Sequence, residues 1–323
     1  MKKIFAAIFA VVLVLGLSVC AFAFSEGGFG NSNEVIEEVV TYINPIYAEV
    51  VSEEDLLKLE PFEDTPTTFS TKATVYYTDL EEAGAVLRKQ IVNRNEKATV
   101  CFESTESDPR KVSRDVFDAA LVHTGVSDEG DYLKWNYGGY KAGISYYPKG
   151  GKYFYTFTYL VDYYTTAEQE AVLAEEIDKL IASLNLSGKG HFDKIMAVHD
   201  YLRDNVQYDY THLNDPDYKL QYTAYAALLN KTAVCQGYAN LFYRIMLELG
   251  VDTRIISGTS GSKPHGWNIV RLDDRYYDID STWDSTTSSD KYCLLCEAHF
   301  DDHLRDPEYN TAEFKAEYPV SEF

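Results

Sequence analysis

The feature that most constrains the fold of this chain is a change of hydrophobic period in its second half. Residues 191–206 and 234–249 carry apolar side chains at the three- and four-residue spacing of amphipathic helices. From residue 254 onward, apolar and polar residues alternate, as in strands that are buried on one face. Helices followed by an antiparallel sheet are typical of the α+β class, which we therefore expect for residues 166–323.

Residues 72–165 have the pattern of a smaller α/β unit. The elements expected within it are helices at 80–92 and 114–123, strands at 73–77 and 99–102, and a hairpin that turns at residues 148–151. Ahead of this unit we expect a helical stretch over residues 33–59, broken at Pro45. The Pro-, Ser- and Thr-containing residues 60–71 are typical of a linker.

The start of the chain has the composition of an export signal. Lys2 and Lys3 precede an uncharged apolar run over residues 4–19, and residues 21–23 read Ala-Phe-Ala, which suits signal peptidase. We therefore expect a secreted or cell-surface protein with no stable membrane span after cleavage. A lipoprotein attached through Cys20 is the alternative, although Val precedes that cysteine where a small residue is usual.

These patterns divide the chain into four parts. The expected parts are a signal peptide at 1–23, an N-terminal segment and linker at 24–71, a small α/β domain of unknown role at 72–165, and the α+β domain at 166–323.

Charge excludes one class of partner. The formal net charge is −22 at pH 7, whereas binding to phosphate backbones needs clustered Lys and Arg. We therefore expect no nucleic-acid partner, and the sequence leaves the oligomeric state open.

Removal of the expected signal peptide would leave four cysteines, at positions 101, 235, 293 and 296. Four are too few for a disulfide scaffold in a domain of this size. Cys293 and Cys296, followed by His299 and His303, invite a zinc interpretation. Usual zinc fingers place a long loop between the Cys pair and the His pair, and here only two residues intervene. Packing is the favoured role over a zinc site or a Cys293–Cys296 disulfide, and we expect no metal and no cofactor.

Cys235 stands where a predicted helix begins. The unpaired N–H groups and the dipole of a helix start favour an anion, and the thiolate is the nucleophilic form of cysteine. The same N–H groups could hold an oxyanion. A small buried hydrophobic side chain is the alternative interpretation.

His265 and Asp280 are predicted to meet across a hairpin. Residues 265–272 and 275–280 flank Asp273-Asp274, and a two-residue turn there makes paired residue numbers add to about 547. His265 and Asp280 then become diagonal neighbours on one face, about 7–8 Å apart at Cα. The carboxylate could hold one imidazole nitrogen while the other receives a proton from Cys235.

Three motifs in this order resemble the transglutaminase-like superfamily. They are Val-Cys-Gln-Gly-Tyr-Ala at 234–239, His-Gly-Trp-Asn at 265–268 and Asp-Ile-Asp-Ser-Thr-Trp at 278–283. The resemblance covers residues 165–305. It implies a papain-like core of helices packed on an antiparallel sheet, preceded here by the smaller α/β domain.

The resemblance also implies the chemistry of a cysteine enzyme. Cys235 would attack an amide carbonyl, His265 would act as base and then as acid, and Asp280 would orient the imidazole. Tyr225 and Gln207 are conceivable side-chain oxyanion donors beside the Cys235 N–H. The expected substrate is protein or cell-wall peptide, with hydrolysis slightly favoured over crosslinking. The alternative function is a non-catalytic binding or structural module with the same fold.

Overall fold

The computed structural model describes residues 35–59, 74–213 and 215–322. Within them, helices and strands gather around two large hydrophobic clusters. One is built from residues before the predicted boundary at residue 165, and the other from residues after it together with Tyr132 and Trp135. The expected signal peptide and the linker at 60–71 lie outside the described residues.

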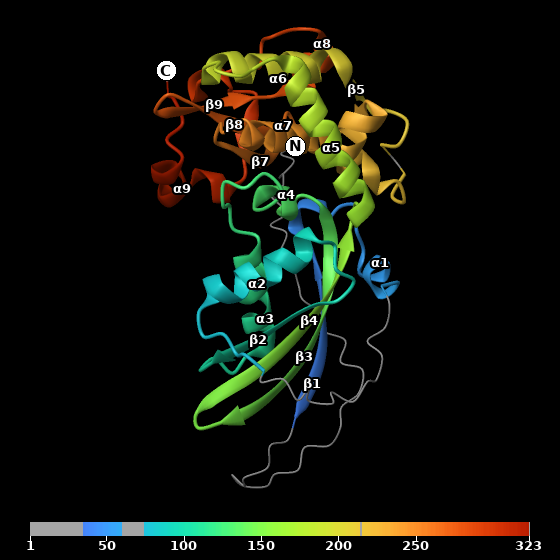
Figure 1. Cartoon of the computed structure of the whole chain (residues 1–323), viewed down its shortest axis with the longest axis vertical. Coiled ribbons are helices and arrows are strands. Elements are labelled where there is room, and N and C mark those ends of the chain that lie inside the picture. The colour runs from blue at the N-terminus through green and yellow to red at the C-terminus, as the bar shows by residue number, and fades with distance from the viewer. Residues whose placement is uncertain (1–34, 60–73, 214, 323) are drawn as a thin grey trace, which may run out of the picture. The chain divides into compact units, whose positions relative to one another are not determined.

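The first part of the chain forms a four-stranded antiparallel sheet in the order β1-β3-β4-β2 (Figure 1). Its strands are β1 (Ile36–Ile43), β2 (Ala98–Ser104), β3 (Tyr137–Lys149) and β4 (Lys152–Tyr163), and its helices are α2 (Leu80–Val92) and α3 (Pro109–Ala120). Helix α2 packs against α3 and β2, and their apolar faces bury Leu87, Ile91 and Phe117. The predicted hairpin is confirmed, because Lys149 pairs with Lys152 across the turn.

The prediction of a helix over residues 33–59 is wrong for its first part. Residues Ile36–Ile43 instead form the edge strand β1, each of whose residues pairs with one in β3. The β-branched and aromatic residues of this segment suit a half-buried strand better than a helix. The expected strand at 73–77 is reduced to a single bridge between Tyr77 and Phe102.

The second part confirms the expected succession of helices and strands. Helices α5 (Ala167–Leu184), α6 (His191–Asn205) and α7 (Cys235–Glu248) come first, followed by β7 (Thr253–Ser260), β8 (Lys263–Leu272), β9 (Arg275–Ile279), α8 (Ser281–Thr287) and β10 (His303–Arg305). The strands form an antiparallel sheet in the order β10-β7-β8-β9. Helix α7 packs on β7 and β8, and α6 packs on α7 and α8. The fold class is therefore α+β, as predicted.

Short elements complete the described structure. They are α1 (Glu53–Leu57), α4 (Asp131–Lys134), α9 (Ala312–Glu317), the parallel pair β5 (Gln207–Tyr208) and β6 (Thr232–Ala233), the π-helix Ala226–Asn230, and 3-10 helices at Pro45–Tyr47, Lys219–Tyr222, Glu297–His299 and Pro307–Asn310.

Buried ion pairs cross the predicted domain boundary. Asp131 in α4 accepts two hydrogen bonds from the Arg254 guanidinium in β7, at 2.7 and 2.9 Å, and a third from the Ile255 backbone N–H. Glu170 in α5 pairs with Arg94 at 2.8 Å. The division at residues 165 and 166 stays a prediction, and these contacts join the two parts wherever the boundary lies.

Among the described residues, no helix has both the length and the apolar character needed to cross a membrane.

Candidate active site

Cys235 is the first residue of α7, as predicted. Val234, at the N-cap, offers no side-chain acceptor to the first turn, so the backbone N–H groups there have no capping side chain. The residue is buried, with 5% of its surface exposed, and its sulfur lies 3.1 Å from Oε1 of the neighbouring Gln236. A sulfur at the positive end of a helix is the arrangement expected for a nucleophilic cysteine.

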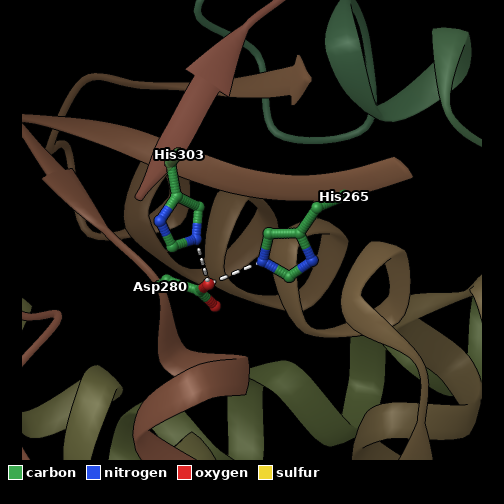
Figure 2. A group of neighbouring side chains, drawn as sticks. All are labelled: His265, Asp280 and His303. Carbon is green, nitrogen blue, oxygen red and sulfur yellow. Dashed lines mark hydrogen bonds and ion pairs between the residues drawn. The ribbon is translucent and has the colours of Figure 1, made fainter. Parts of the chain in front are cut away.

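His265 and Asp280 meet as the predicted register requires. Asn268 pairs with Ile279 and Leu272 with Arg275, so paired residue numbers add to 547. The His265 Nε2 atom lies 2.6 Å from Asp280 Oδ2 (Figure 2). Because Nε2 is held by the carboxylate, Nδ1 is the nitrogen left for the Cys235 thiol.

Asp280 is fixed by the end of β9 and the start of α8. Its Oδ1 atom accepts the backbone N–H groups of Thr282 at 2.9 Å and Trp283 at 3.1 Å, so the residue also caps α8. Its own N–H donates to the Tyr292 carbonyl. One oxygen therefore orients the carboxylate and the other is free to hold imidazole nitrogens.

The charges of the site reinforce one another. Burial alone would lower the pKa of His265, but the Asp280 carboxylate and the Cys235 thiolate outweigh it, and the pKa lies well above its ordinary value. Burial alone would raise the pKa of Asp280, but His265 and His303 hold that pKa well below its usual range. An ionised Asp280 beside a protonated His265 is the state that favours a Cys235 thiolate.

His303, in β10, is a member of this cluster that the sequence analysis did not assign to the catalytic site. Its Nε2 atom lies 3.1 Å from Asp280 Oδ2 and its Nδ1 atom 2.7 Å from Asp302 Oδ1. The ring stacks on Phe300 with centroids 4.0 Å apart. The adjacent acid and histidine at 302–303 were visible in the sequence, but only the pairing of β10 with β7 brings them to Asp280.

The zinc interpretation of residues 293–303 is not supported by this geometry. Cys293 and Cys296 are both free thiols. The Cys296 sulfur contacts His299 Nδ1 at 3.2 Å, whereas the Cys293 sulfur contacts Met196 at 3.5 Å. His303 is committed to Asp280. The donor atoms of His265, Asp280 and His303 do lie within 4.8 Å of one another, but their closest contacts are hydrogen bonds.

A cleft of about 710 Å³ opens onto Cys235 and His265. One wall comes from the first part of the chain, and the residues lining it include Tyr42, Ile46, Tyr47, Leu121, Trp135 and Tyr137. The structure adds that the first part of the chain shapes the approach to the thiol.

Neither of the two side chains considered as conceivable oxyanion donors lines the cleft. The cleft is lined by Tyr208 and Gln221, and neither Gln207 nor Tyr225 is among its residues. Gln221 Nε2 already donates to the His212 carbonyl at 3.0 Å, so that amide holds a loop. Tyr208 is desolvated and lies close enough to Cys235 for both burial and the thiolate to raise its pKa.

Comparison with known proteins agrees with the geometry. Residues 178–281 match the family model of the transglutaminase-like superfamily, a segment that contains Cys235, His265 and Asp280. This part of the chain is a transglutaminase-like domain. His303 lies beyond the matched segment.

Two curated relatives resemble part of this chain. Kyphoscoliosis peptidase of Homo sapiens is 25% identical over 134 residues, which are 37% of this chain and 20% of the relative. The Mus musculus protein of the same name is 25% identical over 180 residues, 46% of this chain and 27% of the relative. The chain thus spans about a quarter of the length of these relatives, or less.

A solved structure of a TGase overlaps with 57% of this chain and 51% of its own, at 22% identity and a TM-score of 0.34. At the coarse level of the family, the transglutaminase-like match supports an enzyme.

Proposed function

We propose that this protein is a cysteine enzyme that cleaves amide bonds through an acyl-enzyme, with Cys235 as nucleophile, His265 as base and acid, and Asp280 as the group that orients the imidazole. The observation that carries the proposal is the 2.6 Å contact between His265 Nε2 and Asp280 Oδ2, with Cys235, at a helix start, lining the same cleft as His265.

The reaction follows from these positions. The Cys235 thiolate attacks the carbonyl carbon of the substrate, and the backbone N–H groups at the start of α7 stabilise the developing oxyanion. Imidazolium His265 gives its proton to the leaving nitrogen as the C–N bond breaks. His265 then takes a proton from the nucleophile that opens the thioester, which is water in hydrolysis or an amine in crosslinking.

We favour hydrolysis over crosslinking, because water is always present and no amine-binding group can be assigned. Given the signal-like residues 1–23, we also propose that the protein acts outside the cell on protein or cell-wall peptides.

Turnover on a set of glutamine- and lysine-containing peptides tests the function. The expected result is release of a free amine or ammonia without incorporation of a labelled diamine. Cys235→Ala should abolish the release, whereas Cys101→Ala, a matched control in the other sheet, should leave it unchanged. Efficient diamine incorporation would favour crosslinking. A folded protein without turnover, whose Cys235 has ordinary thiol reactivity, would favour the non-catalytic binding module.

A further inference from the structure

Exposed apolar side chains gather at the rim of the cleft that holds Cys235 and His265. Val50, Val122 and Leu213 are between 40% and 49% exposed, and all three line the cleft. They come from three separate segments of the chain, so no single hydrophobic run accounts for them. Apolar side chains that converge on one hollow of the surface are typical of a binding site.

The inner wall of the cleft is apolar as well. Ile46 and Tyr47 line it, and Tyr47 is buried. Trp135 completes this wall beside the catalytic histidine, because a Cβ on Gly266 would lie only 2.8 Å from the edge of its indole ring. The indole therefore packs directly on the residue that follows His265. A large apolar side chain of a substrate can thus be buried in the same cleft as the catalytic pair.

Two buried polar atoms of the cleft walls lack partners. The indole Nε1 of Trp135 and the amide Oε1 of Gln221 make no hydrogen bond with any described residue. Both residues are 1% exposed, and both line the cleft. Gln221 Nε2 donates to the His212 carbonyl, so its oxygen is left as an acceptor. An unpaired buried donor and acceptor are costly, and a peptide main chain offers a carbonyl to the one and an N–H to the other.

The charges of the cleft disfavour an acidic occupant. The described residues that line it include one lysine, Lys134, and no arginine, but four carboxylates, at Glu49, Asp118, Asp306 and Glu308. Lys134 Nζ lies 3.2 Å from Glu308 Oε1, so its charge is already paired. A substrate carboxylate would meet charge of its own sign in the cleft.

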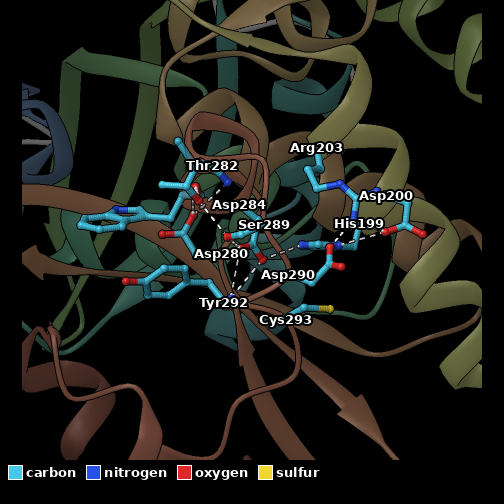
Figure 3. A network of polar contacts seen from close by, with 12 residues as sticks. His199, Asp200, Arg203, Asp280, Thr282, Asp284, Ser289, Asp290, Tyr292 and Cys293 are labelled. Carbon is cyan, nitrogen blue, oxygen red and sulfur yellow. Dashed lines mark hydrogen bonds and ion pairs between the residues drawn. The ribbon is translucent and has the colours of Figure 1, made fainter.

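The polar network behind Asp280 takes no part in this recognition. His199 in α6 and Asp284 in α8 have fully buried side chains, and His199 Nε2 lies 3.0 Å from Asp284 Oδ2 (Figure 3). Asp284 also accepts the Tyr292 N–H at 3.1 Å, and the Tyr292 carbonyl accepts the N–H of Asp280. None of these residues lines the cleft. Selection of the substrate therefore falls to the cleft walls.

We propose that the cleft selects protein segments with large apolar side chains next to the scissile amide and discriminates against peptides of small or acidic residues. This inference rests on the proposed function, because it names the substrate class of the same site. The apolar side chains would lie against the rim and the inner wall, while the main chain pairs with Trp135 and Gln221. Large apolar side chains are mostly buried in folded proteins, so the substrates are unfolded segments or exposed chain ends.

Peptide binding to the full chain carrying Cys235→Ala, measured by isothermal titration calorimetry, tests the inference without turnover. The probes are acetyl-Gly-Leu-Phe-Gln-Leu-Gly-amide and two peptides in which Leu and Phe are all replaced by Ala or by Glu. We expect the Leu-Phe peptide to bind at least about tenfold more tightly than the Ala peptide, and the Glu peptide to bind most weakly. Equal affinities, or no measurable binding of the Leu-Phe peptide, would overturn the proposal.

Substitutions at the rim place the binding in the cleft. The Val50→Ser, Val122→Ser double variant should weaken binding of the Leu-Phe peptide roughly fivefold and leave the Ala peptide unchanged. Val126→Ser is the matched control, because Val126 is 48% exposed, lies four residues after Val122 and does not line the cleft. It should change neither affinity. Equal losses in the double variant and the control would place the binding elsewhere and contradict the proposal.

A charge variant tests the discrimination against acidic peptides. Asp118 is exposed and lines the cleft, so Asp118→Asn should strengthen binding of the Glu peptide severalfold and leave the Leu-Phe peptide unchanged. An unchanged affinity for the Glu peptide would refute the electrostatic part of the proposal.

Turnover in the parent protein separates this inference from the proposed function. Preferential binding of the Leu-Phe peptide without turnover of any peptide would contradict the enzyme and retain the selective cleft. Equal kcat/KM for the Leu-Phe and Ala peptides would retain the enzyme and contradict the selectivity.

Discussion

His303 Nε2 lies 3.1 Å from Asp280 Oδ2, the oxygen that also binds His265. Both ring nitrogens of His303 face carboxylate oxygens, since Nδ1 lies 2.7 Å from Asp302 Oδ1. Contacts with His265 and His303 hold the pKa of Asp280 well below its usual range, although burial alone would raise it. Two imidazole rings therefore share one oxygen of an ionised carboxylate.

The contact from His303 should help Asp280 to orient His265. His303→Gln can still donate an N–H to Asp280, so we expect it to keep most of the rate of Cys235 alkylation by iodoacetamide at pH 7. His303→Phe removes the donor and should slow that alkylation severalfold. Equal rates in His303→Phe and the parent protein would mean that the contact does not support the pair.

Alkylation of Cys235 by iodoacetamide should be fast well below the ordinary pKa of a thiol. The raised pKa of His265 keeps the imidazole protonated at neutral pH, where it stabilises the thiolate. We expect a plateau between about pH 6 and 8 and at least a tenfold loss at pH 6 in His265→Ala. A profile that rises only near pH 8.5, the same in both proteins, would indicate an unassembled pair.

Tyr208→Phe tests the side-chain oxyanion donor. Tyr208 lines the cleft with Cys235, so its hydroxyl is our candidate for a side-chain donor to the substrate oxygen. Its loss should lower kcat by about 10²-fold with little change in KM, as for other oxyanion donors. Tyr225→Phe, outside the cleft, is the matched control. Equal turnover of Tyr208→Phe and the parent protein would leave the backbone N–H groups as the donors.

His199 should make stability depend on pH. Its pKa is raised to about 10, so its stabilising contribution is complete below about pH 6.5 and is lost as the pH rises towards 10. Each pKa unit corresponds to about 1.4 kcal/mol. Urea unfolding at pH 6, 8 and 10 should show a falling free energy of unfolding in the parent protein and a flatter dependence in His199→Gln. Parallel curves would contradict this linkage.

Arg254→Met should destabilise the fold by about 3–5 kcal/mol, because it leaves Asp131 buried without its counter-charge. The Asp131→Asn, Arg254→Met double variant should recover part of the loss, since no unpaired charge remains. Urea unfolding measures both. A loss below about 1 kcal/mol in the single variant would mean that the ion pair does not bind the two parts of the chain together.

Local patterns predicted much of the second part of the chain correctly. Helices α6 and α7 follow from apolar spacing, and the hairpin of β8 and β9 follows from alternation around a two-residue turn. The hairpin places His265 and Asp280 together because both residues belong to it, and the turn between β8 and β9 fixes which residues of the two strands pair.

Patterns of the same kind failed where a segment depends on a distant partner. The segment Ile36–Ile43 became a strand because β3, about 100 residues later, offers a sheet edge. No local pattern in the segment records that partner, and local preference gives way to pairing.

The sequence by itself determined the α+β succession, the helix start at Cys235 and the local meeting of His265 with Asp280. The tertiary structure decided that β10 brings His303 to Asp280, that α8 brings Asp284 to His199, and that the first part of the chain lines the cleft. The physical reason is that these contacts join residues far apart in the chain. Their formation depends on the packing of whole elements, which no local spacing of side chains specifies.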